Sequence, residues 1–278
     1  MSQPKSLRLM SYLAPNMFWF YQAVGAYLER VFDIETQIAQ GFTDPLCDPV
    51  MLHDQLDIAF ICGLPFIRYH RVTPDQLETL VAPVMQASRY QNHPVYFADV
   101  IVNADSNIKT FDDLAGKTLC YNDLGSNSGY NLLRYRLMQG GYSSSFFGKV
   151  IPSGFHQRSI QWVVNKLADC SVIDSTVLEE ELRNSPELSR HLRVIESIGS
   201  CTMPPIVAAK RLGTTFINKL KFALLHPDTE LKSAMNQAQI KGYAAMSLED
   251  YFAIGRMYDS AVEVGYEIVS PEQKLINN

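Results

Sequence analysis

Apolar runs of strand length alternate with helical patterns from the start of the chain. The first part of the sequence predicts strand, helix, strand, helix and strand at Leu7–Leu13, Phe18–Val31, Glu35–Ala39, Asp48–Asp54 and Leu56–Cys62. This βαβαβ order predicts an α/β fold with a largely parallel sheet covered by helices. Ligands of such sheets bind beyond the carboxyl ends of the strands.

A second series of strands and helices begins near residue 96 and leads back to the first. Strands and helices are expected at Tyr96–Asn103, Lys117–Tyr121, Tyr130–Met138, Ser159–Leu167, Cys170–Ile173, Thr176–Arg183, Leu192–Glu196, Ile206–Lys210, Phe216–Leu225 and Leu248–Val264. We therefore predict one lobe from residues 1–95 plus 202–278, and a second, inserted lobe from residues 96–201. The last helix carries apolar residues at helical spacing and is expected to pack on the first lobe through Tyr251, Ile254, Tyr258 and Val262.

Composition and charge narrow the possible partners. The chain has 278 residues, of which 47% are hydrophobic and 19% charged, as in ordinary globular proteins. Its 24 basic and 29 acidic residues give a net charge of −5 without a basic stripe, which argues against nucleic acid as a partner. The apolar runs fall short of the roughly 20 residues that span a bilayer, so we expect no membrane insertion.

Cysteines and the N-terminus bear on the compartment. The five cysteines include no close pair, which predicts reduced thiols and neither a metal site nor a cofactor. The sequence shows no secretory leader, and this leaves two possibilities: a cytoplasmic protein, or a periplasmic one whose leader has been removed. The cysteines favour the first.

The segment Ser126–Gly129 carries the clearest chemistry. A strand delivers Ser126, Asn127, Ser128 and Gly129 to the start of a helix, with Tyr130 next. Backbone N–H groups and the positive end of the helix dipole would meet the serine hydroxyls there, which suits an oxyanion. A simpler interpretation is that Ser128 only caps the helix.

Other candidates follow neighbouring strands. His156 and Ser159 begin another helix, and Asp174 ends a strand, where a carboxylate suits a ligand with an amino group. Helix capping and core packing are the alternatives for these residues. Three aromatic residues are expected where the first lobe meets the ligand: Tyr12, Phe42 and Phe66. Motifs of nucleotide enzymes, serine hydrolases and zinc proteases are absent from the sequence.

Two motifs together resemble a known family. Phe111–Lys117 followed by Ser126–Tyr130 resembles the phosphate, phosphite and phosphonate substrate-binding proteins of ABC importers. The resemblance implies a two-lobed type II periplasmic-binding fold, closure of the lobes on a small oxyanion, and an ABC permease as partner. It implies ligand contacts from the turn and His156, and matches Tyr96 to a cleft tyrosine.

Departures from the family pattern concern the ligand and the function. The middle residue of the turn is Asn127 where the family usually has threonine, and Phe66 and Phe42 lie where tyrosines are common. Lost hydroxyl donors predict a less polar or differently shaped ligand than phosphonate. We favour a binding protein without catalysis. A cytoplasmic enzyme on the same fold, similar to the chorismate dehydratase of menaquinone synthesis, and a ligand sensor are the alternatives, and His156 with Asp174 is the only plausible acid–base pair.

Overall fold

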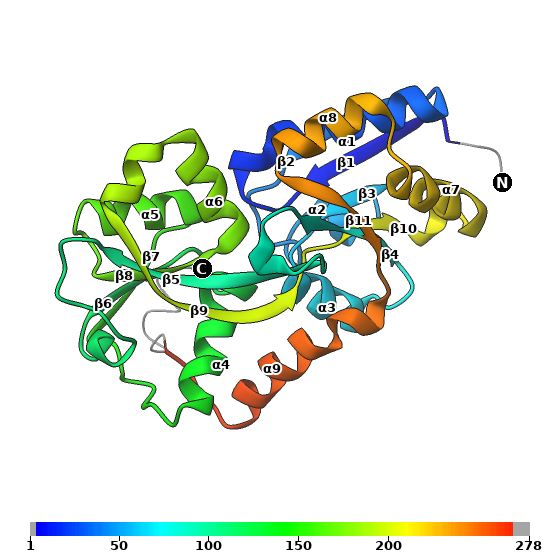
Figure 1. The fold of residues 1–278 in the computed structure, drawn as a ribbon. Helices are drawn as coiled ribbons and strands as arrows, with labels where there is room; N and C mark the ends of the chain where they lie inside the picture. The colour runs from blue at the N-terminus through cyan, green and yellow to red at the C-terminus, as the bar shows by residue number, and fades with distance from the viewer. Residues whose placement is uncertain (1–3, 269–278) are drawn as a thin grey trace. The chain divides into compact units, whose positions relative to one another are not determined.

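The computed structural model describes residues 4–268 (Figure 1). Within this range the chain divides into two compact units. The first unit comprises residues up to 95 together with 202–254, and the second comprises 96–201 together with residues from 255 on. The α/β class is confirmed, because each unit has a β-sheet flanked by helices.

The first unit is built on a six-stranded sheet with the order β11-β4-β10-β3-β1-β2. Its strands are β1 (Ser6–Ser11), β2 (Glu35–Gln40), β3 (Ile58–Phe60), β4 (Leu77–Met85), β10 (Ile206–Ala209) and β11 (Ile240–Ala245). Strand β1 is parallel to β2 and β3, but β10 is antiparallel to both β3 and β4, and β11 is antiparallel to β4. The expectation of a mostly parallel sheet is therefore wrong for this unit, because the returning chain adds β10 in the opposite direction.

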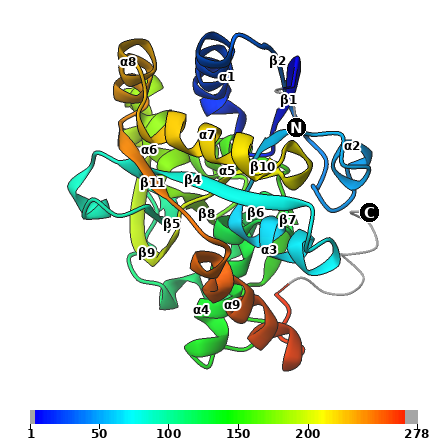
Figure 2. The ribbon, with the colours of Figure 1, turned by 90° about the vertical axis from the view of Figure 1, so that its right-hand side faces the viewer.

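Helices cover this sheet and make its core. Its α-helices are α1 (Phe18–Phe32), α2 (Pro49–Leu52), α3 (Gly63–Val72), α7 (Thr214–Leu225) and α8 (Thr229–Gln237). Helix α1 packs on β2, α7 and α8, and α7 packs on β4 and β11 (Figures 1 and 2). The alternation of β1 buries Leu7 and Leu9 beneath these helices, as expected of a strand with one buried face.

The second unit has a five-stranded sheet with the order β7-β6-β8-β5-β9. The strands are β5 (Val95–Asn103), β6 (Thr118–Tyr121), β7 (Lys149–Pro152), β8 (Cys170–Asp174) and β9 (Leu192–Thr202). Strand β6 is parallel to β7 and β8, whereas β5 is antiparallel to β8. The α-helices between these strands are α4 (Leu132–Gln139), α5 (His156–Val164) and α6 (Ser175–Asn184). Parallel strands therefore bring the starts of α4, α5 and α6 to one edge of the sheet.

The C-terminal boundary differs from the one expected. Helix α9 (Phe252–Glu263) begins in the first unit, where Tyr251 just before it packs on Phe66, but residues from 255 on belong to the second unit. Arg134 donates to the carbonyl oxygen of Tyr258, and Tyr266 donates to that of Tyr142. These hydrogen bonds hold residues 255–268 on the second unit. Four apolar positions were expected to pack on the first lobe, but Tyr258 belongs to the second unit and the side chain of Val262 is 48% exposed. The end of the predicted first lobe, residues 269–278, lies outside the described range.

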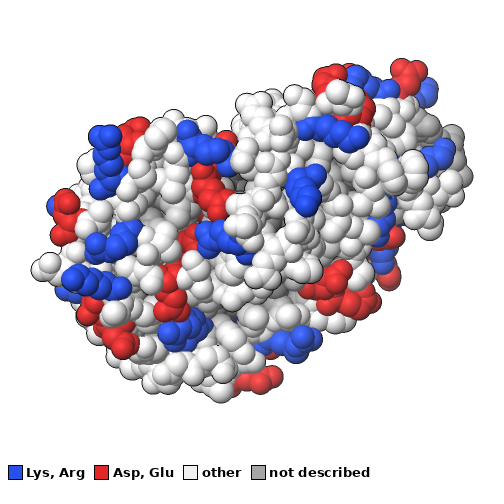
Figure 3. Space-filling model, in the orientation of Figure 1, with Lys and Arg blue, Asp and Glu red and all other residues white. Residues whose placement is uncertain are grey.

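Charged side chains are mixed over the face shown in Figure 3, where lysines and arginines alternate with aspartates and glutamates. Within residues 4–268, no helix is long and apolar enough to cross a membrane.

Candidate functional site

The Ser-Asn-Ser-Gly segment forms the first turn of a helix. Residues Asn127–Asn131 form a π-helical turn that continues into α4, and the N–H of Asn131 donates to the carbonyl oxygen of Ser126 over 3.0 Å. The helix therefore starts three residues earlier than expected, because the Ser126 side chain caps it by accepting from the N–H of Gly129 at 3.0 Å. The N–H groups of the first turn have no acceptor within a helix. Such π-turns occur often at functional sites.

His156 lies directly beside this turn. It is the first residue of α5 and only 7% exposed, and its Nε2 is 3.1 Å from the hydroxyl of Ser128. Nε2 is also 3.4 Å from the side-chain nitrogen of Asn122, which follows β6. Burial lowers the pKa of His156 to about 4, so the imidazole is neutral at neutral pH. The expected pairing of His156 with the serine turn is thus present within the second unit.

Two potential donors, the hydroxyl of Ser128 and the amide nitrogen of Asn122, face one ring nitrogen of this imidazole. The Asn122 amide nitrogen also donates to Asp123 at 3.2 Å, which sets the orientation of the amide, so Nε2 of His156 must act as an acceptor and Nδ1 carries the proton. Nε2 has one lone pair, and the hydroxyl of Ser128 competes with Asn122 for it. Nδ1 is buried without a partner among the described residues. The Ser128 hydroxyl can therefore turn to a ligand while Asn122 keeps its contact with Nε2.

Gly129 is required by the close approach of Asn122. A Cβ atom at position 129 would lie 1.9 Å from Oδ1 of Asn122 and 3.2 Å from Cε1 of His156. The Asn122 oxygen is buried over this glycine and has no hydrogen-bond partner among residues 4–268. Sequence reasoning did not single out Asn122, although its position directly after a strand, at the edge where ligands bind, was a usable signal.

The side chain of Asn127 is directed into the second unit. It is fully buried, and its nitrogen donates to the hydroxyl of Tyr96 at 2.7 Å and to the sulfur of Cys201 at 3.2 Å. Its oxygen accepts from the amide of Asn131 at 2.9 Å. Tyr96 is thus brought to the turn as expected, but through Asn127. Cys201 was missed, because no local pattern around it points to a contact with the turn.

Three further candidates in the second unit have partners inside the protein. Tyr130 is buried and hydrogen-bonded to Glu267, and its pKa is raised by burial and by that carboxylate. Ser159 is fully buried, with its hydroxyl 2.6 Å from that of Ser153. Asp174 caps α6 by accepting from the N–H and hydroxyl of Thr176, as the capping alternative predicts, and burial raises its pKa to about 6.

Tyr12, Phe42 and Phe66 belong to the first unit and differ in exposure. Tyr12 donates to Asp48 at 2.8 Å, and burial raises the pKa of its hydroxyl. Phe42 is 70% exposed in the loop after β2, whereas Phe66 is 1% exposed. The ring of Phe66 packs edge-on against that of Tyr251, with 5.4 Å between the ring centroids. Phe66 lies inside α3, so its geometry supports core packing. Of these three residues, Phe42 is the one whose side chain is exposed to solvent.

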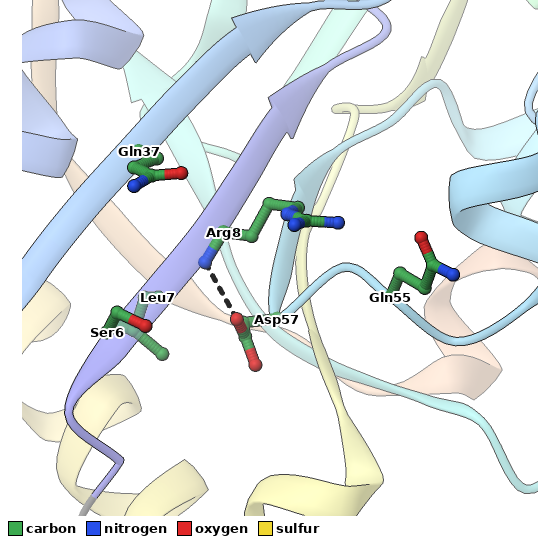
Figure 4. A pocket seen from close by; sticks show the side chains of 6 residues that line it. All are labelled: Ser6, Leu7, Arg8, Gln37, Gln55 and Asp57. Carbon is green, nitrogen blue, oxygen red and sulfur yellow. Dashed lines mark hydrogen bonds between the residues drawn. The ribbon is translucent and has the colours of Figure 1, made fainter.

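The first unit also contains a hollow whose polar groups bond to one another. This hollow of about 430 Å³ is lined by Arg8, Asp57 and four neighbours (Figure 4), but the carboxylate of Asp57 is held there by the N–H of Arg8 and by the side chain of Arg211. Its polar groups serve to join strands. Among residues 4–268, no group of three His, Cys, Asp or Glu side chains could hold a metal ion. His156 and Asp174, the one acid–base pair considered, are each bonded to other residues.

Comparison with known proteins identifies the family. The family described as "ABC transporter, phosphonate, periplasmic substrate-binding protein" matches residues 10–251. The chain belongs to this family. The phosphonates-binding periplasmic protein of Escherichia coli (strain K12) is 30% identical over 132 residues, which are 46% of this chain and 39% of that protein.

Solved structures agree on the fold. A binding protein component of an ABC phosphonate transporter from Pseudomonas aeruginosa has a TM-score of 0.81 at 18% identity, over 99% of this chain and 93% of that one. PhnD1 of Prochlorococcus marinus, solved in complex with methylphosphonate, also has a TM-score of 0.81 at 18% identity, over 95% of this chain and 100% of that one. The periplasmic-binding-protein fold expected from the sequence is confirmed, and these relatives are binding proteins.

Proposed function

We propose that the protein is the substrate-binding protein of an ABC importer, that it captures a phosphonate-like oxyanion in the periplasm, and that an ABC permease is its partner. The observation that carries this proposal is the sharing of one acceptor at the turn: the Ser128 hydroxyl and the Asn122 amide nitrogen both face Nε2 of His156, so the hydroxyl is available to a ligand. The oxygens of an oxyanion are hydrogen-bond acceptors and would receive the Ser128 hydroxyl. Membership of the phosphonate family supports the same ligand class.

The form of the site favours an anion held by neutral donors. His156 is neutral, because burial lowers its pKa to about 4, and Ser126 and Ser128 carry no charge. The hydroxyls, the N–H groups at the start of the helix and the helix dipole therefore supply the attraction. Methylphosphonate, the ligand of PhnD1 from Prochlorococcus marinus, is the first compound to test.

Thermal denaturation and calorimetry in phosphate-free buffer test this proposal. We expect methylphosphonate, aminoethylphosphonate or phosphite to raise the melting temperature, since a ligand at 100 times its Kd stabilises the folded state by about 2.7 kcal/mol. Ser128→Ala should weaken binding tenfold or more, because a hydrogen bond to a charged group contributes about 1.5–3 kcal/mol. Ser143→Ala, in an exposed loop of the same unit, is the matched control and should bind as the unchanged protein does.

Three outcomes would count against the proposal. If none of these oxyanions shifts the melting temperature of the folded protein, the ligand class is wrong. If Ser128→Ala and Ser143→Ala bind equally well, the turn is not the site. Chemical conversion of the ligand during incubation, followed by phosphorus NMR, would show an enzyme instead of a binding protein.

A further inference from the structure

The Asn127 side chain has no hydrogen left for a ligand. Its amide nitrogen carries two hydrogens, and these point to the hydroxyl of Tyr96 at 2.7 Å and the sulfur of Cys201 at 3.2 Å. Its oxygen accepts from Asn131, one helical turn further on, at 2.9 Å. The side chain is fully buried. Asn127 therefore cannot replace a ligand-binding hydroxyl in the turn, and its function must be a different one.

The two partners of the Asn127 nitrogen occupy special places in the chain. Tyr96 is the first residue of the second unit, at the start of β5, and Cys201 is the last before the chain returns to the first unit, near the end of β9. These partners are 31 and 74 positions away from Asn127 in the sequence. One amide group thus joins the turn to both strands by which the chain enters and leaves the second unit.

We propose that Asn127 is a positioning residue that couples ligand binding at the Ser126–Ser128 turn to the two connecting strands, β5 and β9. This inference rests on the proposed function. The backbone of Asn127 is part of the turn that would meet the oxyanion, while its side chain holds Tyr96 and Cys201. Hydrogen bonds weaken steeply when their angles change, so a shift of the turn on binding alters both contacts together.

An asparagine suits this function better than a threonine would. A threonine hydroxyl has one hydrogen and could donate to only one of the two partners. The asparagine amide donates to both Tyr96 and Cys201 and still accepts from Asn131. Asn127 therefore makes a connection to both strands that a single hydroxyl could not make.

Hydrogen exchange followed by mass spectrometry, with and without methylphosphonate, measures this coupling. In the unchanged protein we expect the ligand to slow exchange at least twofold in peptides covering residues 94–98 and 199–203. Asn127→Leu, which keeps the size of the side chain without its hydrogen bonds, should lose at least half of this ligand-induced protection. Asn165→Ala, at an exposed position of the same unit, is the control and should keep it.

A second pair of variants separates coupling from a general loss of structure. Cys201→Ala removes the acceptor and should reduce the protection, whereas Cys201→Ser restores an acceptor and should recover it. If Asn127→Leu and Cys201→Ala both bind methylphosphonate and show full protection, the inference is overturned while the proposed function stands. If the unchanged protein binds no oxyanion in calorimetry, both the proposed function and this inference fail.

Discussion

Two buried groups of the second unit respond to acid in opposite directions, and one substitution should reveal this. Burial lowers the pKa of His156 from its usual 6.5 to about 4 and raises that of Asp174 from 3.8 to about 6. Below pH 6.5 the unfolded chain binds a proton at His156 before the folded chain does, so acid destabilises the folded state. Below pH 6 the folded chain binds a proton at Asp174 before the unfolded chain does, so acid stabilises it.

The two contributions oppose each other in the unchanged protein. Each corresponds to about 3 kcal/mol of the free energy of unfolding. Asp174→Asn keeps an oxygen that can cap α6 but removes the titration. Between pH 6.5 and 4, this variant should therefore lose about 3 kcal/mol more stability than the unchanged protein. His156→Gln should show the opposite sign, with a relative gain of similar size.

Urea denaturation at half-unit steps of pH, in the absence of ligand, measures these differences. Comparison of variant with unchanged protein removes the contributions of other groups, such as Asp113 and Asp228, whose pKa values are lowered by hydrogen bonds. Asp75→Asn, at a fully exposed position, controls for the loss of one surface carboxylate. A difference between Asp174→Asn and unchanged protein that stays constant across this range would refute the reasoning.

Two further predictions concern packing around the turn. Gly129→Ala would place a methyl group 1.9 Å from Oδ1 of Asn122, so we expect at least tenfold weaker methylphosphonate binding in calorimetry. The control is Gly242→Ala, whose added Cβ would have no heavy atom within 4 Å and which should bind normally. Equal affinities of the two variants would contradict this account. Arg134 is 3% exposed and bonded to Glu267, whose carboxylate is 32% exposed, so Glu267→Gln leaves a buried guanidinium without its charged partner and should cost about 3 kcal/mol in urea denaturation. Arg134→Met removes the buried charge and leaves a partly exposed carboxylate, so it should cost only about 1 kcal/mol; a larger loss for Arg134→Met than for Glu267→Gln would contradict this reasoning.

Local patterns in the sequence predicted most of the fold and the position of the anion turn. The strand before the turn, the small polar residues and the helix after it are adjacent in the chain, so their spacing alone places serine hydroxyls at a helix start. Strand β4 was not predicted, and Pro83 within it is a residue that usually argues against a strand; here Pro83 pairs with Tyr243 of β11.

Long-range contacts were beyond sequence reasoning. The inward orientation of Asn127 depends on Tyr96 and Cys201, 31 and 74 positions away, and no local pattern reports such contacts. The periodicity of the last helix showed correctly that it has an apolar face, but periodicity does not say which unit that face meets. Arg134 decides this for residues from 255 on, through its bond to the carbonyl oxygen of Tyr258.

A crystal structure of the protein grown with methylphosphonate tests the central claim most directly. We predict phosphonate oxygens within hydrogen-bond distance of the hydroxyls of Ser126 and Ser128 and of the first N–H groups of the helix, with the Asn127 side chain still bonded to Tyr96 and Cys201. Methylphosphonate bound elsewhere in the protein, with the turn unoccupied at saturating ligand, would contradict the account.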